Sequence, residues 1–162
     1  MSSLYYTGNY RTEEQLAQMN ELEAAGVCIF CPQHLPNYRP VVHRTDHWTV
    51  TTNRFPYRGT QLHYLMLPDE HVEDLVDLSP TAQADFWVAL RWARDHHDLR
   101  YYGLASRNGD CAYTGATIRH VHVHLVQGDV DNPEHQRVRV SLSSHPREVL
   151  VRDPDQFHAS GP

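Results

Sequence analysis

The stretch GATIRHVHVHLVQGD, residues 115–129, decides the fold prediction because it sets three histidines at two-residue spacing between apolar residues. Successive side chains of a β-strand point to opposite faces. We therefore expect a strand over 118–126, with valine and leucine packed on one face and His120, His122 and His124 together on the other. Three neighbouring imidazoles are costly in an apolar core and have no advantage on a solvated face. The pattern indicates a functional site.

Length and charge limit the kind of protein. A chain of 162 residues fits one domain with a single core. Its formal net charge of −6 opposes general binding to nucleic acid. The first residues lack an apolar leader, and no apolar run approaches the roughly 20 residues that span a bilayer. We expect a soluble, cytoplasmic protein with neither nucleic acid nor membrane as a partner.

The remaining sequence predicts an α+β domain built on an antiparallel sheet of about five strands. A short helix over 13–25 is indicated by a capping-box pair, Thr12 and Gln15, and a long helix to about residue 97 by Ser79 and Pro80 at its start. Alternating or β-branched runs predict strands within 41–52, 62–67 and 101–106, and an edge strand over 137–144. We divide the chain into an N-terminal helical segment, 1–26, a main domain, 27–145, and a loose tail, 146–162.

The cysteines point to a metal ion. Cys28 and Cys31 have the spacing of two thiolate ligands, which suits a metal site better than a disulfide framework. A closed tetrahedral zinc site needs two more ligands, and histidines are the usual complement. We expect Cys111 to be a free thiol.

Chemistry alone leaves three interpretations of the histidine strand open. Two or three histidines bind a catalytic zinc with one open position. Alternatively, one histidine is a nucleophile, and the turn Gly115-Ala116-Thr117 offers N–H groups and a hydroxyl to an anionic centre. A third possibility is a binding module without turnover.

These motifs resemble a known family. GATIRHVHVHLVQ is similar to the signature of the histidine triad (HIT) superfamily, and NRFPYRGTQLHYLMLPDEHVEDLVDL, residues 53–78, is similar to its segment before the long helix. CIFC, residues 28–31, resembles the zinc-bearing branch. The resemblance covers roughly 27–129. It implies a HIT-like fold, a homodimer, and cleavage of a nucleoside phosphoramidate or a dinucleoside polyphosphate by hydrolysis or nucleotidyl transfer.

The resemblance also implies site roles. The middle histidine, His122, becomes the nucleophile that carries a nucleotidyl group, and His124 contacts the phosphate and the leaving atom. His63 lies near the triad and orients the nucleophile's imidazole. The remaining positions hold the phosphate, the leaving group or the ribose: Asn108, Thr117, Gly115, Ala116 and Asn53. A structural zinc is bound by Cys28, Cys31, His71 and His120.

Departures from the family pattern concern specificity. The triad is followed by Gln127-Gly128-Asp129, where Pro-Arg and an aromatic residue are common, so substrate specificity does not transfer from better-known members. The uridylyltransferase branch carries Gln at the position of His124, so the histidine favours hydrolysis over transfer. Three aromatic residues are candidates for stacking on a base: Trp48, Phe55 and Tyr57.

Overall fold

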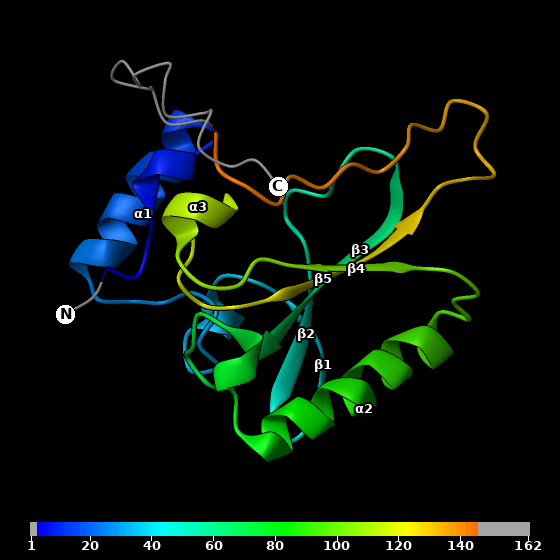
Figure 1. Cartoon of the computed structure of the whole chain (residues 1–162), viewed down its shortest axis with the longest axis horizontal. Coiled ribbons are helices and arrows are strands. Elements are labelled where there is room, and N and C mark those ends of the chain that lie inside the picture. Colours follow the sequence, from blue (N-terminus) through cyan, green and yellow to red (C-terminus); the bar gives the residue numbers. More distant parts are fainter. Residues whose placement is uncertain (1–2, 146–162) are drawn as a thin grey trace, which may run out of the picture.

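The computed structural model describes residues 3–145 and contains a five-stranded sheet in the order β1-β2-β3-β5-β4, in which every neighbouring pair is antiparallel (Figure 1). The strands are β1 (Val41–Arg44), β2 (Trp48–Thr52), β3 (Thr60–Pro68), β4 (Gly103–Ser106) and β5 (Val123–Gly128). The helices are α1 (Glu13–Ala24), α2 (Pro80–His96) and α3 (Cys111–Thr114), with 3-10 turns at Thr7–Asn9, Leu35–Asn37 and Leu75–Asp77. The prediction of an α+β fold with about five antiparallel strands is confirmed.

The long helix α2 covers one face of the sheet. Ser79 caps it by accepting the N–H of Ala82 at 3.3 Å, and Pro80 occupies the first turn, as its sequence predicts. The Trp48 indole donates to the carbonyl of Ala82 at 2.7 Å and is 1% exposed, which fixes the helix on β2. Trp48 therefore belongs to this core and is not a stacking residue.

The opposite face carries α1 and the cysteine segment, well apart from α2 in Figure 1. Thr12 caps α1 by accepting the N–H of Gln15 at 3.1 Å. A second buried cluster forms here from the N-terminal segment, the cysteine segment and β3, and its members include Tyr5, Met19, Leu22, Cys28, Phe30, Leu35 and Leu65. Residues 4–22 thus contribute side chains to the same core as the cysteines.

The predicted strand over 118–126 is shorter than expected. β5 begins only at Val123, because the preceding residues pair elsewhere. Ile118 bridges to Tyr5, and the N–H of Arg119 donates to the carbonyl of Leu4 at 2.9 Å. His122 and His124 nevertheless remain neighbours, with ring centroids 5.0 Å apart, and the ring of His120 lies against the two cysteine sulfurs.

Two further features of the structure differ from the sequence prediction. Residues 137–144 contain no strand in the described part of the chain, so that prediction was wrong. The loop before the triad contains the short helix α3, capped by Asp110 through the N–H of Ala112 at 2.9 Å. The predicted tail, 146–162, lies outside the described residues. Within residues 3–145 we find no helix with the length and apolarity needed to cross a membrane.

Candidate functional site

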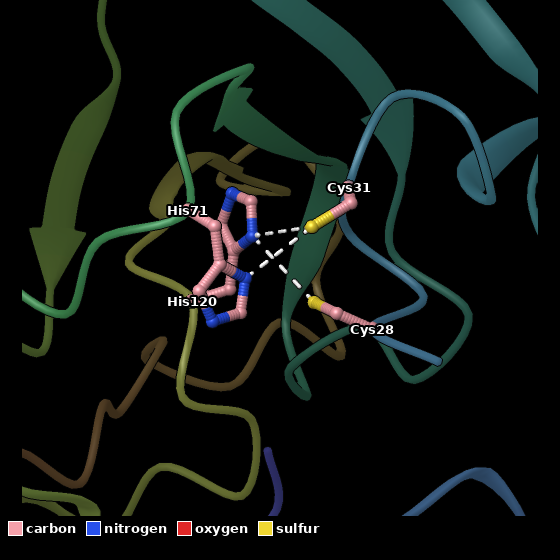
Figure 2. A group of neighbouring side chains, drawn as sticks. All are labelled: Cys28, Cys31, His71 and His120. Carbon is pink, nitrogen blue, oxygen red and sulfur yellow. Dashed lines mark hydrogen bonds between the residues drawn. The ribbon is translucent and has the colours of Figure 1, made fainter. Parts of the chain in front are cut away.

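Four side chains from three separate segments meet at one end of the sheet (Figure 2). Cys28 and Cys31 precede β1, His71 follows β3, and His120 precedes β5. Their ligand atoms all lie within 4.8 Å of one another, and three of the four residues are buried. The structure therefore assembles the predicted set, and it is the one such group among the described residues.

The geometry of this cluster fits a tetrahedral metal ion. The Sγ of Cys31 lies 3.3 Å from Nδ1 of His71 and 3.7 Å from Nδ1 of His120, and the Sγ of Cys28 lies 3.6 Å from the same His120 atom. Zinc with its usual bond lengths separates a sulfur and a nitrogen ligand by about 3.6 Å. Nε2 of His120 faces the carbonyl oxygen of Pro68 at 2.9 Å, which places the proton there and leaves Nδ1 free for a metal.

The thiols are poised to lose protons to a metal. A hydrogen bond from Cys31 lowers the pKa of the Cys28 thiol to about 3, and the same contact and burial raise the pKa of Cys31. The protein thus already favours the thiolate form of Cys28. A cation between the two sulfurs would favour the thiolate form of Cys31 as well.

A pocket opens on the α1 face of the sheet beside the other two triad members. His122 and His124 line it, together with Asn53 and the turn Gly115-Ala116-Thr117. This is the neighbourhood that the sequence predicted for the reacting group and its phosphate donors. Phe55 and Tyr57 also line the pocket, as the stacking prediction requires.

His122 presents one unprotonated ring nitrogen to this pocket. Its Nδ1 lies 3.0 Å from the carbonyl oxygen of His120, which can only accept, so Nδ1 carries the proton and Nε2 has a free lone pair. Burial, followed by the charge of Arg107 among other causes, lowers the pKa of His122 to about 4. The imidazole is therefore neutral at neutral pH.

His63 contacts His124 and not the expected nucleophile. Its Nε2 lies 2.9 Å from Nδ1 of His124, and its Nδ1 accepts the backbone N–H of Tyr57 at 3.1 Å. The prediction that His63 orients His122 was wrong, because a backbone carbonyl performs that task. Asn53 places its amide nitrogen 3.1 Å from Nε2 of His63 and so belongs to the same network.

Both histidines of this network are held neutral. Burial lowers the pKa of His63 to about 4 and that of His124 to about 2, and the positive charge of Arg11 contributes to both. For His124 the charges of His122 and Arg107 add to the effect. Both imidazoles of the network are therefore uncharged at neutral pH.

Arg107 is the site residue that the sequence prediction missed. Its guanidinium is buried and donates from Nη1 to His124 Nε2 at 3.1 Å, from Nη2 to the Tyr57 hydroxyl at 3.1 Å, and from Nε and Nη2 to the Ser141 carbonyl. Ala105 pairs with His124 in the β4–β5 register, so Arg107, two residues later, continues on the same face. An arginine at the end of a predicted strand was the available signal.

Asn108, the neighbour of Arg107, is not brought to the pocket. It is exposed, and its side-chain amide oxygen, Oδ1, accepts the N–H of Leu75 at 3.1 Å. Alternation along the chain turns Arg107 inward and Asn108 outward. Gly115 reaches the pocket with φ 78°, and its N–H donates to the Ser144 hydroxyl at 3.1 Å.

Comparisons with known proteins give one family model and several solved structures of similar fold. The family model described as "HIT domain" matches residues 36–131. A HIT family hydrolase from Clostridium thermocellum is 20% identical over 66% of this chain and 95% of its own, with a TM-score of 0.52. A hypothetical protein from Leishmania major is 23% identical over 82% and 89%, with a TM-score of 0.54.

A third similar structure is a histidine triad nucleotide-binding protein from Candida albicans, 17% identical over 81% of this chain and 90% of its own, with a TM-score of 0.51. At these identities the likeness concerns the fold. A comparison with curated protein sequences gives no match.

Proposed function

Because the chain belongs to the HIT domain family, we propose that it is a nucleotide hydrolase or nucleotidyltransferase that works through a covalent nucleotidyl group on His122. One observation carries the proposal. The Nδ1 proton of His122 is donated to the His120 carbonyl, so an unprotonated Nε2 faces a pocket that also contains the Gly115-Ala116-Thr117 turn. A neutral imidazole held in one tautomer is a competent nucleophile toward phosphorus.

The first half of the reaction forms the covalent intermediate. Nε2 of His122 attacks the phosphorus of the nucleoside phosphate, the bond from phosphorus to the leaving group breaks, and the electron pair goes to the leaving atom. Charge develops on the phosphoryl oxygens at this point. Ala116 and Thr117 line the pocket, and we assign their backbone N–H groups and the Thr117 hydroxyl to that charge, each such donor being worth about 3 kcal/mol. The Gly115 N–H is already donated to Ser144.

The second half regenerates the histidine. Water attacks the phosphorus, the bond from phosphorus to Nε2 breaks, and the lone pair returns to the ring while the proton of water passes to solvent. The Nδ1–H of His122 stays on the His120 carbonyl throughout. A nucleophile other than water in the same position would give transfer in place of hydrolysis.

We assign zinc to the cluster of Cys28, Cys31, His71 and His120 as a structural ion. Its distances fit zinc, and bound there the ion ties the cysteine segment to the backbone of the triad. His120 links the two sites: its ring is a ligand, and its carbonyl holds His122. The three cysteines are free, which suits a reducing, cytoplasmic compartment.

The zinc hydrolase alternative is disfavoured by the same geometry. Because the ring of His120 is engaged with the cysteines, only His122 and His124 of the strand remain for a catalytic zinc, one fewer than the three protein ligands usual at such a site. A binding module without turnover is the remaining alternative, and turnover itself distinguishes it.

A turnover assay with product analysis tests the proposal. The metal-loaded protein is incubated with adenosine and guanosine phosphoramidates and with dinucleoside polyphosphates. Release of a nucleoside monophosphate is expected, and it should vanish in His122→Ala while nucleotide binding persists. Tight binding of a mononucleotide without turnover of any substrate would establish the binding module instead.

We also propose a homodimer across the β4 edge. β4 is a terminal strand of the sheet, and beside it lies an apolar groove lined by residues that include Val76, Trp87 and Leu104, which are 76%, 61% and 42% exposed. An exposed strand edge next to exposed apolar side chains suits a second copy. Analytical ultracentrifugation should give a dimer for the parent chain and a monomer for Leu104→Asp; a monomeric parent chain would refute the dimer.

A further inference from the structure

The turn before the triad is held from behind by the N-terminal segment, residues 4–9. The N–H of Arg119 donates to the carbonyl of Leu4 at 2.9 Å, and the N–H of Tyr6 donates to the carbonyl of Thr117 at 3.0 Å. An antiparallel bridge joins the same two segments between these contacts. The backbone that leads into the triad is therefore fixed by residues from the start of the chain.

Asn9 extends this contact with a side chain that binds the turn at two points. Its Nδ2 donates to the carbonyl oxygen of Cys111 at 2.8 Å and to the carbonyl oxygen of Ala116 at 2.8 Å. Carbonyl oxygens only accept, so the amide nitrogen with its two hydrogens must lie on this side of Asn9. An aspartate has the same shape but would place an anionic oxygen against both carbonyls.

The contact with Ala116 sets the direction of one peptide group. In a trans peptide the carbonyl oxygen and the N–H that follows it point in opposite directions, and all described peptides of the chain are trans. Ala116 and Thr117 line the pocket, whereas Asn9 does not, so Asn9 holds the Ala116 oxygen on the side away from the pocket. The Thr117 N–H is then directed toward the pocket.

That N–H group is available to a ligand. Neither the Ala116 N–H nor the Thr117 N–H donates to an acceptor within residues 3–145, whereas the Gly115 N–H is occupied by the Ser144 hydroxyl at 3.1 Å. Backbone N–H groups that point into a concave turn bind anions, and phosphoryl oxygens are suitable acceptors.

Resting on the proposed function, we propose that Asn9 is a positioning residue that keeps the Thr117 N–H directed at a phosphoryl oxygen of the nucleoside phosphate. Asn9 does not line the pocket and acts through the peptide between Ala116 and Thr117. It lies outside residues 36–131, which the family model matches. The N-terminal segment thus serves the chemistry in addition to the core.

The loss of Asn9 should affect the transition state more than binding. A donor that is oriented before the reaction stabilises the charge that develops on the phosphoryl oxygens, and only such differential stabilisation raises kcat. Without the two contacts from Nδ2, the peptide between Ala116 and Thr117 can rotate and turn its carbonyl oxygen toward the phosphate. A carbonyl oxygen repels the developing charge.

Steady-state kinetics and amide NMR test the inference on the zinc-loaded protein. Diadenosine triphosphate and adenosine 5′-phosphoramidate are assayed with the parent chain, Asn9→Ala, Asn9→Asp and Asn20→Asp. Asn20 is exposed on α1, and its side chain forms no hydrogen bond with another described residue, so Asn20→Asp adds the same charge without altering the turn. The NMR signal of the Thr117 amide is followed during titration with adenosine monophosphate, which requires no turnover.

The two substitutions at Asn9 should act mainly on kcat. Asn9→Asp should lower kcat by about 100-fold, as for the loss of one oxyanion donor, and Asn9→Ala by about 10-fold, with KM within about threefold of the parent value. Asn20→Asp should match the parent chain. Adenosine monophosphate should shift the Thr117 amide hydrogen downfield in the parent chain and in Asn20→Asp, and this shift should be lost in Asn9→Ala.

Several results would overturn the inference: the parent kcat in folded Asn9→Ala, an equal loss in Asn20→Asp, or a Thr117 shift that survives in Asn9→Ala. A purely structural Asn9 would give the third result together with a lowered unfolding temperature. Unfolding temperatures show which variants are folded, and Asn9→Ala alone decides if Asn9→Asp is unfolded. A parent chain that turns over neither substrate would contradict the proposed function, and the Thr117 shift would then decide the inference.

Discussion

His120 and His122 lie two residues apart, yet the structure places them in two different chemical environments. The ring of His120 faces two sulfur atoms, and Nδ1 is its free atom. The ring of His122 lines a pocket with arginines, and Nε2 is its free atom. One residue type thus serves as a metal ligand or as a nucleophile according to what other segments bring to it.

The comparison shows how one segment builds both sites. The His120 ring donates through Nε2 to the Pro68 carbonyl, and its own carbonyl receives the Nδ1–H of His122. The contacts that hold the His120 ring and backbone in place therefore also fix the tautomer of His122. The predictions below separate structural effects at the cluster from chemical effects at the pocket.

Removal of the nucleophile should have the largest effect. We expect His122→Ala to lower kcat by at least about 10⁴-fold, because the covalent route is lost. The metal content and the unfolding temperature should change little. Product analysis at fixed times measures kcat, metal analysis measures the metal content, and thermal unfolding gives the unfolding temperature. Loss of the metal in this variant would mean that the two sites are not separable.

Removal of a metal ligand should have the opposite signature. Cys28→Ser should abolish metal binding and lower the free energy of unfolding by about 3 kcal/mol or more, because binding energy at such a site is folding energy. Denaturant unfolding with and without a chelator measures the loss. Cys111→Ser, which alters a buried thiol outside the cluster, is the control and should retain the full metal content.

Acid should destabilise the pocket through His63 and His124. Both pKa values are lowered in the folded protein, to about 4 and about 2, whereas the unfolded chain titrates near 6.5. Between those values the unfolded state binds more protons, so stability should decrease as the pH falls below about 6.5. Unfolding free energies measured across pH 4–7 should show this slope, and His124→Gln should flatten it. An exposed control, His145→Gln, should leave the slope intact.

The smallest effect is expected at Asn108. Asn108→Ala removes one hydrogen bond to the Leu75 N–H and should cost about 1 kcal/mol of stability. Its kcat/KM should remain within about twofold of the parent value. A loss of 100-fold in kcat/KM would return the phosphate role to Asn108 and contradict the placement of Arg107.

The sequence predicted what local patterns determine. The caps of α1 and α2, the strand alternation and the four metal-ligand positions follow from spacing and from the family resemblance. The late start of β5 does not, because it depends on pairing between Ile118 and Tyr5, which are far apart in the chain. The sequence also did not predict that Arg107, and not Asn108, reaches the pocket. Neighbouring residues at the end of β4 point to opposite faces, so an error of one residue in the alignment of this strand reverses which side chain faces the pocket.

The central claim is that His120 serves the metal and His122 the chemistry. Native mass spectrometry of the protein after brief incubation with a dinucleoside polyphosphate tests it most directly, with His122→Ala and Cys28→Ser alongside. We expect one zinc per chain and an acid-labile nucleoside monophosphate adduct in the parent chain, zinc without adduct in His122→Ala, and no zinc in Cys28→Ser. An adduct that persists in His122→Ala, or zinc lost from that variant, would contradict the claim.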